Sequence, residues 1–126
     1  MFPKIENIFN SHLKLLKERR VSLTDLVFTK RISKNYYEYE DRDTVENNAL
    51  LDLSLGGKSL RAGEILKYVV TDYYGRHSKK RSIPIELAHS QTKFDVKRYC
   101  EILQEVTNTV TEPFGITLKA ENVMQL

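Results

Sequence analysis

The sequence predicts an α+β fold, mainly helical, in which about three helices pack on a small β-sheet. Two long segments, 3–20 and 93–112, and a shorter one between them repeat apolar side chains every three or four residues, as amphipathic helices do. Two runs rich in β-branched and aromatic residues, 26–29 and 65–71, are typical of strands. The chain has 126 residues, about the length of one domain, so we treat 1–126 as a single unit.

The composition and the cysteine count exclude several classes of protein. Hydrophobic residues make up 40% of the chain, which is enough to build a core and too many for a disordered chain. No apolar run approaches the roughly 18 residues of a membrane span, and no secretory signal follows Met1, so we expect an intracellular protein with no membrane partner. The single cysteine, Cys100, excludes an internal disulfide, and the three histidines lack the spacing of a zinc site.

The first helix is expected over residues 3–20. Pro3 suits its first turn, where the missing N–H has no helical partner in any case. The seam of this helix consists of Ile5, Ile8, Phe9, His12 and Leu16. His12 could therefore be a hydrogen-bonded core histidine. A strand or extended link follows at residues 26–29.

The second helix is expected to begin near Asp43 or Thr44, because Asp43 and Glu46 have the spacing of a capping box. Gly56 and Gly57 end the helix, since glycine readily accepts the left-handed conformation that commonly follows a helix. The buried stripe of this helix is expected to consist of Val45, Ala49, Leu50 and Leu53.

The second half of the chain holds the best strand candidate, residues 65–71, and the last helix, residues 93–112. Between them, Pro84 confines any strand around it to the edge of the sheet, because proline has no N–H for a ladder. Thr92 and Asp95 have the spacing of a helix start. The apolar stripe of the last helix comprises Val96, Tyr99, Cys100, Leu103, Val106 and Val110.

The sequence contains no pattern of catalytic or metal-binding residues. It has no P-loop, dinucleotide-binding or nucleophile-elbow motif. Residues 56–59 (Gly-Gly-Lys-Ser) end like a phosphate loop, but they follow an expected helix instead of a strand. Asp41 and Asp43 could bind magnesium, although a negatively charged helix N-terminus explains them better. We expect Cys100 to be a small buried hydrophobe, and we assign no catalytic residue, metal ligand or cofactor to this chain.

The small net charge of +3 conceals basic and acidic blocks. Residues 1–34 and 53–82 each carry five net positive charges, whereas residues 35–52 carry five net negative ones. The fold could combine the basic blocks into one face, although such blocks also occur as ordinary solvated surface. No helix has the polar face that reads base edges, so the residues suit sequence-independent contacts with phosphates. These candidate DNA-binding residues are Thr29, Lys30, Arg31, Lys34, Lys58, Ser59, Arg61, Gly63 and Arg81.

Four segments of the chain form an ordered set of motifs. They are residues 21–34 (V-S-L-T-D-L-V-F-T-K-R-I-S-K), 61–69 (R-A-G-E-I-L-K-Y-V), 81–84 (R-S-I-P) and 94–100 (F-D-V-K-R-Y-C). The set resembles the thumb domain of family B DNA polymerases of the archaeal type, in which L-V-I-T-K-x-I-T, R-x-G-x-x-I-x-Y-V, R-A-I-P and Y-D-x-x-Y-Y follow one another. The resemblance covers roughly residues 3–116.

The resemblance implies a non-catalytic domain that grips the backbone of a primer–template DNA duplex just behind the polymerase site. It implies an N-terminal helix and link (1–25), a thumb core (26–116) and a tail (117–126). The residues that it places at the duplex are Thr29, Lys30, Arg31, Arg61, Gly63 and Arg81.

The chain departs from the family by lacking its palm motifs, the D-T-D and S-L-Y-P-S segments that hold metal ions and the K-K-R-Y stretch. The resemblance therefore implies a thumb subunit or fragment of a split DNA polymerase, in the cytoplasm with the nucleoid. Its partner would be a catalytic chain that binds the magnesium, docked on the apolar side of the first helix. Two alternatives stay open: a stand-alone, sequence-independent nucleic-acid-binding protein, and a protein-interaction module with no DNA role.

Overall fold

The computed structural model describes residues 2–34, 44–75 and 80–115 of the chain. The elements in chain order, with 3-10 helices written η, are α1 (Phe2–Lys17), η1 (Leu23–Leu26), β1 (Phe28–Arg31), α2 (Val45–Leu55), β2 (Ile65–Val70), β3 (Ser82–Pro84), η3 (Ile85–Leu87), α3 (Val96–Thr111) and η4 (Glu112–Phe114). Three α-helices and one three-stranded sheet among the described residues confirm the α+β fold class. None of these helices is both long and apolar enough to cross a membrane.

The residues of the chain group into two compact units. The sheet unit is the continuous segment Ser22–Asp95, which contains the three strands and α2. The helical unit joins Met1–Val21 to Val96–Leu126, so it brings together α1 and α3 from the two ends of the chain.

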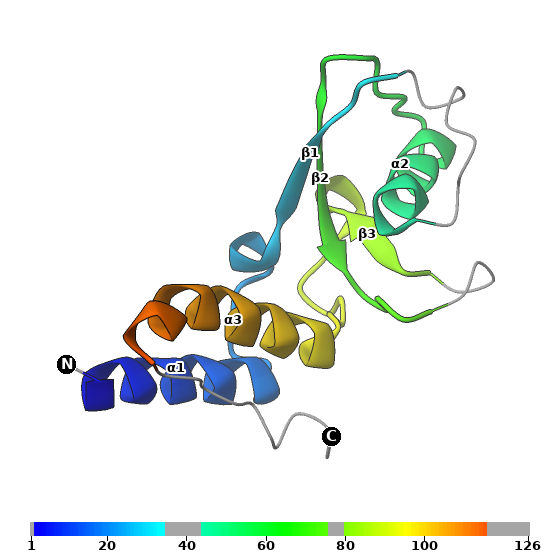
Figure 1. The fold of residues 1–126 in the computed structure, drawn as a ribbon. Coiled ribbons are helices and arrows are strands. Elements are labelled where there is room, and N and C mark those ends of the chain that lie inside the picture. Colours follow the sequence, from blue (N-terminus) through cyan, green and yellow to red (C-terminus); the bar gives the residue numbers. More distant parts are fainter. Residues whose placement is uncertain (1, 35–43, 76–79, 116–126) are drawn as a thin grey trace. The chain divides into compact units, whose positions relative to one another are not determined.

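The sheet is antiparallel, with the strand order β1-β2-β3 and α2 packed against β2 and β3 (Figure 1). Because side chains alternate along a strand, each strand presents one face to α2 and one face away from it. On β2, Leu66 and Tyr68 are buried on the α2 face, whereas Ile65 and Lys67 are exposed on the opposite face. β3 is an edge strand that ends at Pro84, which confirms the limit expected from that proline.

The boundaries of α2 follow from its capping residues. Thr44 is the N-cap, and its Oγ1 accepts a hydrogen bond from the Asn47 N–H at 3.1 Å. At the other end Gly57 takes a φ of +98°, which confirms the expected glycine stop. The expected stripe is confirmed, since its four members, Val45, Ala49, Leu50 and Leu53, are all buried. Asp43, the other expected cap, lies outside the described residues.

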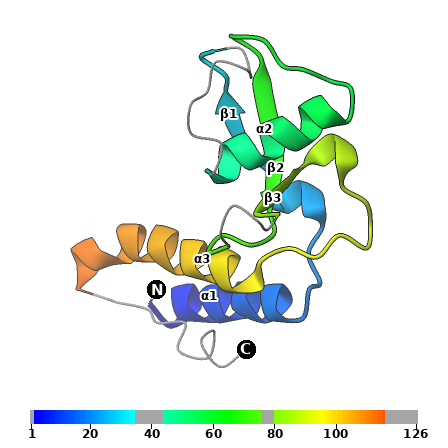
Figure 2. The same cartoon turned by 90° about the vertical axis from the view of Figure 1, so that its right-hand side faces the viewer.

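In the helical unit, α1 and α3 run antiparallel, side by side (Figure 2). Their buried residues include Phe9, Leu13, Leu16, Tyr99 and Cys100. The expectation that His12 belongs to the core is wrong, because His12 is exposed and the buried seam passes through Leu13 instead. Helix α1 ends earlier than expected, at Lys17, because Arg19 adopts a left-handed conformation with a φ of +56°.

The start and the stripe of α3 also differ from the prediction. The helix begins at Val96, three residues after Lys93, so Thr92 and Asp95 do not take the N-cap and N3 positions expected of them. Asp95 Oδ2 accepts from the Tyr73 N–H at 2.8 Å, and Thr92 Oγ1 accepts from the His89 N–H at 2.9 Å. The expected stripe is buried only at its N-terminal end, since Leu103 is half-buried and Val106 and Val110 are 59% and 62% exposed.

Candidate nucleic-acid interface

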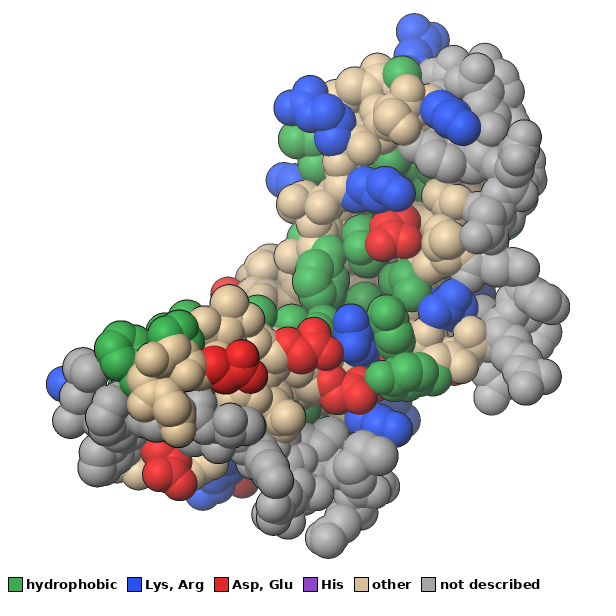
Figure 3. Space-filling view, in the orientation of Figure 1, with side chains coloured by type: hydrophobic (Ala, Val, Ile, Leu, Met, Phe, Trp, Pro, Cys, Tyr) green, Lys and Arg blue, Asp and Glu red, His purple; other side chains and the backbone are tan. Residues whose placement is uncertain are grey.

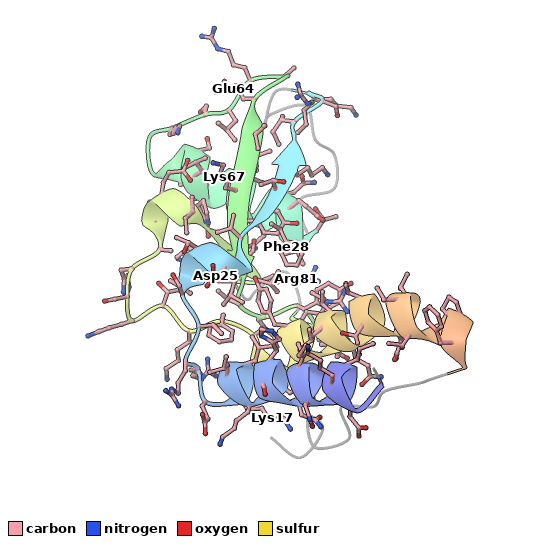
Figure 4. The ribbon with its side chains drawn as sticks, turned by 90° about the vertical axis from the view of Figure 1, so that its left-hand side faces the viewer. Lys17, Asp25, Phe28, Glu64, Lys67 and Arg81 are labelled. Carbon is pink, nitrogen blue, oxygen red and sulfur yellow. The ribbon has the colours of Figure 1, made fainter. Side chains whose placement is uncertain are left out.

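A cluster of cationic and hydroxyl side chains lies on the face of the sheet away from α2, where β1 pairs with the beginning of β2. The ladder places Thr29 opposite Lys67 and Arg31 opposite Ile65. Residues that face each other in a ladder point to the same side of the sheet, and all four of these are exposed. We call Thr29, Arg31, Ile65 and Lys67 the open-face cluster. Figure 4 views the sheet from this side, with Lys67 labelled on β2.

The two cations of the open-face cluster have no acidic partner among the described residues. Neither Arg31 nor Lys67 belongs to an ion pair there. Lys and Arg side chains are gathered around the end of the sheet unit where β1 ends and β2 begins (Figure 3). An exposed cation without a paired carboxylate keeps its charge and its N–H donors available for an external anion.

The turn before β2 brings Arg61 to the same end of the sheet. Gly63, with a φ of +94°, donates its N–H to Ile32 O at 2.6 Å, and Ile32 donates its own N–H to Glu64 O at 2.8 Å. These two bonds extend the β1–β2 ladder beyond Arg31, and the exposed Arg61 lies in the turn that leads into β2 at this end of the sheet. The N–H of Gly63, expected to face a phosphate, is already engaged by Ile32.

Lys30 lies apart from the residues that flank it. It is paired with Leu66, on the face that α2 covers, and its side chain is half-buried. The structure therefore brings Thr29 and Arg31 to one surface and turns Lys30 to the other, because consecutive residues of a strand point in opposite directions.

The candidates beyond the sheet have partners of their own. Lys58 Nζ is 3.1 Å from Glu86 Oε2, and the two side chains form an exposed ion pair. Ser59 Oγ lies 3.3 Å from Ser54 Oγ. Lys34 is exposed, three residues after the end of β1. Of these three candidates, only Lys34 follows directly from the strand that carries the open-face cluster.

Arg81 connects the segments on either side of the β2–β3 loop. Its guanidinium donates a hydrogen bond to Tyr73 O and lies over the Tyr73 ring, 5.9 Å from the centroid. Its backbone N–H donates to Asn48 Oδ1 at 3.2 Å. The side chain is half-buried, at the position labelled in Figure 4. These contacts give Arg81 a structural role, because they hold together the two ends of the β2–β3 loop.

Lys67 is the cation of the open-face cluster that the sequence-based list of candidates omits. The exposed Ile65 and Lys67 alternate with the buried Leu66 and Tyr68, a pattern that is legible in the sequence once a strand is assumed. The pairing of Lys67 with Thr29, however, depends on the register between two strands that are separated by 33 intervening residues. That register cannot be read from either strand alone.

The described residues also include side chains that could take part in metal or thiol chemistry. Within residues 2–34, 44–75 and 80–115, no group of three or more His, Cys, Asp or Glu side chains is placed to hold a metal ion. Asp41 and Asp43 lie outside these ranges. Cys100 is fully buried, as expected of a small core residue, and this burial raises the pKa of its thiol.

Comparison with known proteins identifies the architecture. No family model matches the chain, and no curated protein matches it in sequence. The structure is similar to the family B DNA polymerase from the hyperthermophilic archaeon Pyrobaculum calidifontis, with a TM-score of 0.74 and 24% sequence identity. The match covers 90% of this chain and 14% of the polymerase chain. The chain therefore has the fold of one region of a family B DNA polymerase.

Proposed function

We propose that this chain is the non-catalytic thumb subunit or fragment of a family B DNA polymerase, which grips the backbone of a primer–template duplex for a separate catalytic chain. The fold similarity and the ordered motifs support the choice of family. The open-face cluster is the single observation that carries the DNA contact, because it combines a hydroxyl with two cations that form no ion pair among the described residues, all on one sheet surface.

The chemistry of that cluster favours contact with phosphates without reading of bases. Arg, Lys and Thr side chains all donate to phosphate oxygens. They stand on a sheet surface, and no described helix offers the row of Asn, Gln and Arg side chains that reads a major groove. Binding should therefore depend on salt and not on sequence.

The first test is a fluorescence-anisotropy titration of the chain with labelled duplexes of two unrelated sequences over a range of salt concentrations. We expect micromolar or weaker affinity, equal for both duplexes, with log K falling by roughly 0.9 per unit of log salt for each phosphate neutralised. Lys14→Ala, a charge change on the exposed face of α1, is the control that should leave the slope unchanged. A slope near zero, or a strong preference for one duplex, contradicts the proposal.

The second test adds the catalytic chain. The chain alone should incorporate no nucleotide on a primed template in magnesium or manganese, since the proposal places the metal-binding carboxylates on the partner. Added to a family B catalytic fragment that lacks its thumb, it should lengthen the products made in each binding event. Arg31→Ala with Arg61→Ala should remove most of that gain. Incorporation by the highly purified chain alone contradicts the proposal.

The same experiments separate the two alternative functions. A stand-alone nucleic-acid-binding protein should bind duplex tightly by itself and give the catalytic fragment no advantage. A protein-interaction module should show no salt-dependent affinity for DNA at all.

A further inference from the structure

We propose that Thr29, Arg31 and Lys67 form one binding site for a single phosphodiester group on the open face of the sheet. The inference rests on the proposed function and deepens it, since it assigns three side chains to one phosphate and adds Lys67 to the contact. Lys67 occupies a position that the family motif leaves unspecified, the x between I and Y in R-x-G-x-x-I-x-Y-V.

The ladder sets the spacing of the three side chains. Thr29 and Lys67 are directly opposed, which places their Cα atoms about 4.5–5.5 Å apart. Arg31 lies two residues along β1, diagonal to Lys67, at a Cα separation of about 7–8 Å. Lysine and arginine side chains are long enough to converge from these positions on one anion above the Thr29 hydroxyl, which can donate a third hydrogen bond.

Electrostatics favour an anion at this position. Arg31 and Lys67 are like charges in diagonal positions of one sheet face, within reach of each other's long side chains, so they repel each other. The acidic residue next to the cluster in sequence, Glu64, directs Oε1 to the Arg61 N–H at 2.9 Å, within the turn. A phosphate between the two cations would turn a repulsion into two charge-assisted hydrogen bonds.

The remaining member of the cluster fits the same ligand. Ile65 lies opposite Arg31 and is 50% exposed, so it offers an apolar surface beside the cations. A nucleic-acid backbone alternates charged phosphates with largely apolar sugar faces, whereas a free inorganic anion offers only the charge. The surface therefore fits a phosphodiester chain better than it fits an isolated ion.

The experiment measures duplex affinity and its salt slope by fluorescence anisotropy for Lys67→Gln and Lys67→Arg, with thermal unfolding recorded for each variant. We expect Lys67→Gln to weaken binding by about three- to tenfold and to make the salt slope shallower by about 1. Lys67→Arg should keep the affinity and the salt slope of the unmodified chain, because arginine carries the same charge at the same position. Lys30→Gln, the neighbouring lysine on the α2 face, is the matched control and should change both quantities much less.

A double-mutant cycle tests whether the phosphate is shared. Arg31→Gln and Lys67→Gln together should weaken binding by less than the product of their separate effects, because both side chains serve one group. Independent effects would assign the two side chains to two phosphates and overturn the single site. The proposal would also be overturned if the unmodified chain binds duplex and Lys67→Gln binds it with the same affinity. If the unmodified chain shows no salt-dependent binding, the proposed function itself fails.

Discussion

Lys30 lies directly opposite Leu66 in the β1–β2 ladder, on the face of the sheet that α2 covers, whereas Arg31 points to the open face. The two adjacent cations should therefore differ in their effect on DNA binding. We expect Arg31→Ala to weaken duplex binding by about tenfold, which corresponds to about 1.4 kcal/mol, and Lys30→Ala to weaken it by less than about twofold. Anisotropy titrations at one salt concentration measure this difference. Equal losses for the two variants would mean that the alternation along β1 does not control the contact.

Asn48 holds the start of β3 against α2. Its Oδ1 accepts from the Arg81 N–H at 3.2 Å and from the Ser82 N–H at 3.3 Å. Asn48→Leu removes this acceptor and leaves two part-buried donors unsatisfied, so we expect the free energy of unfolding to fall by about 1–3 kcal/mol. Urea unfolding followed by circular dichroism measures it. Asn10→Ala, an exposed asparagine in α1, is the control, and a similar loss there would contradict the role of Asn48.

Two leucines of α2 provide a matched test of the core. Leu50 is 2% exposed and Leu55 is 78% exposed, and both stand in the same helix. Leu50→Ala should lower the free energy of unfolding by about 2–5 kcal/mol, because it leaves a cavity, whereas Leu55→Ala should change it by less than about 0.5 kcal/mol. Chemical denaturation of the two variants measures both values. The half-buried Leu103 of α3 should give an intermediate loss, below that of Leu50.

The buried thiol of Cys100 predicts a dependence of stability on pH. Burial is the main cause that raises its pKa, with a further increase from Glu101 and an opposing decrease from Lys17. A raised pKa in the folded state means that the contribution of Cys100 is complete below the ordinary thiol pKa of roughly 8.5 and is lost as the pH rises through the folded pKa. Urea unfolding between about pH 7 and 10 should show this loss, and Cys100→Ala should reduce it. An equal loss in Cys100→Ala would assign the pH dependence to other groups.

The elements that the sequence predicts well are those whose signals are local. The stripe of α2 and its glycine stop depend on the 3.6-residue period and on the conformational freedom of Gly57, and both are confirmed. The wrong predictions concern His12 and the C-terminal half of the α3 stripe, where Val106 and Val110 are exposed. They arise because a helical period alone does not say how much of a helix face another element covers.

By itself the sequence determined the fold class, the approximate places of the three α-helices and of the strands, and most of the cations from which a DNA contact could be built. These properties follow from periodicity, glycine and proline positions and charge, which are fixed within a few residues of each position. Only the tertiary structure decided which cations share a surface. The register of β1 against β2 placed Lys67 beside Thr29 and turned Lys30 away, because a ladder joins residues that are distant in sequence, and a shift by one position would exchange the two faces.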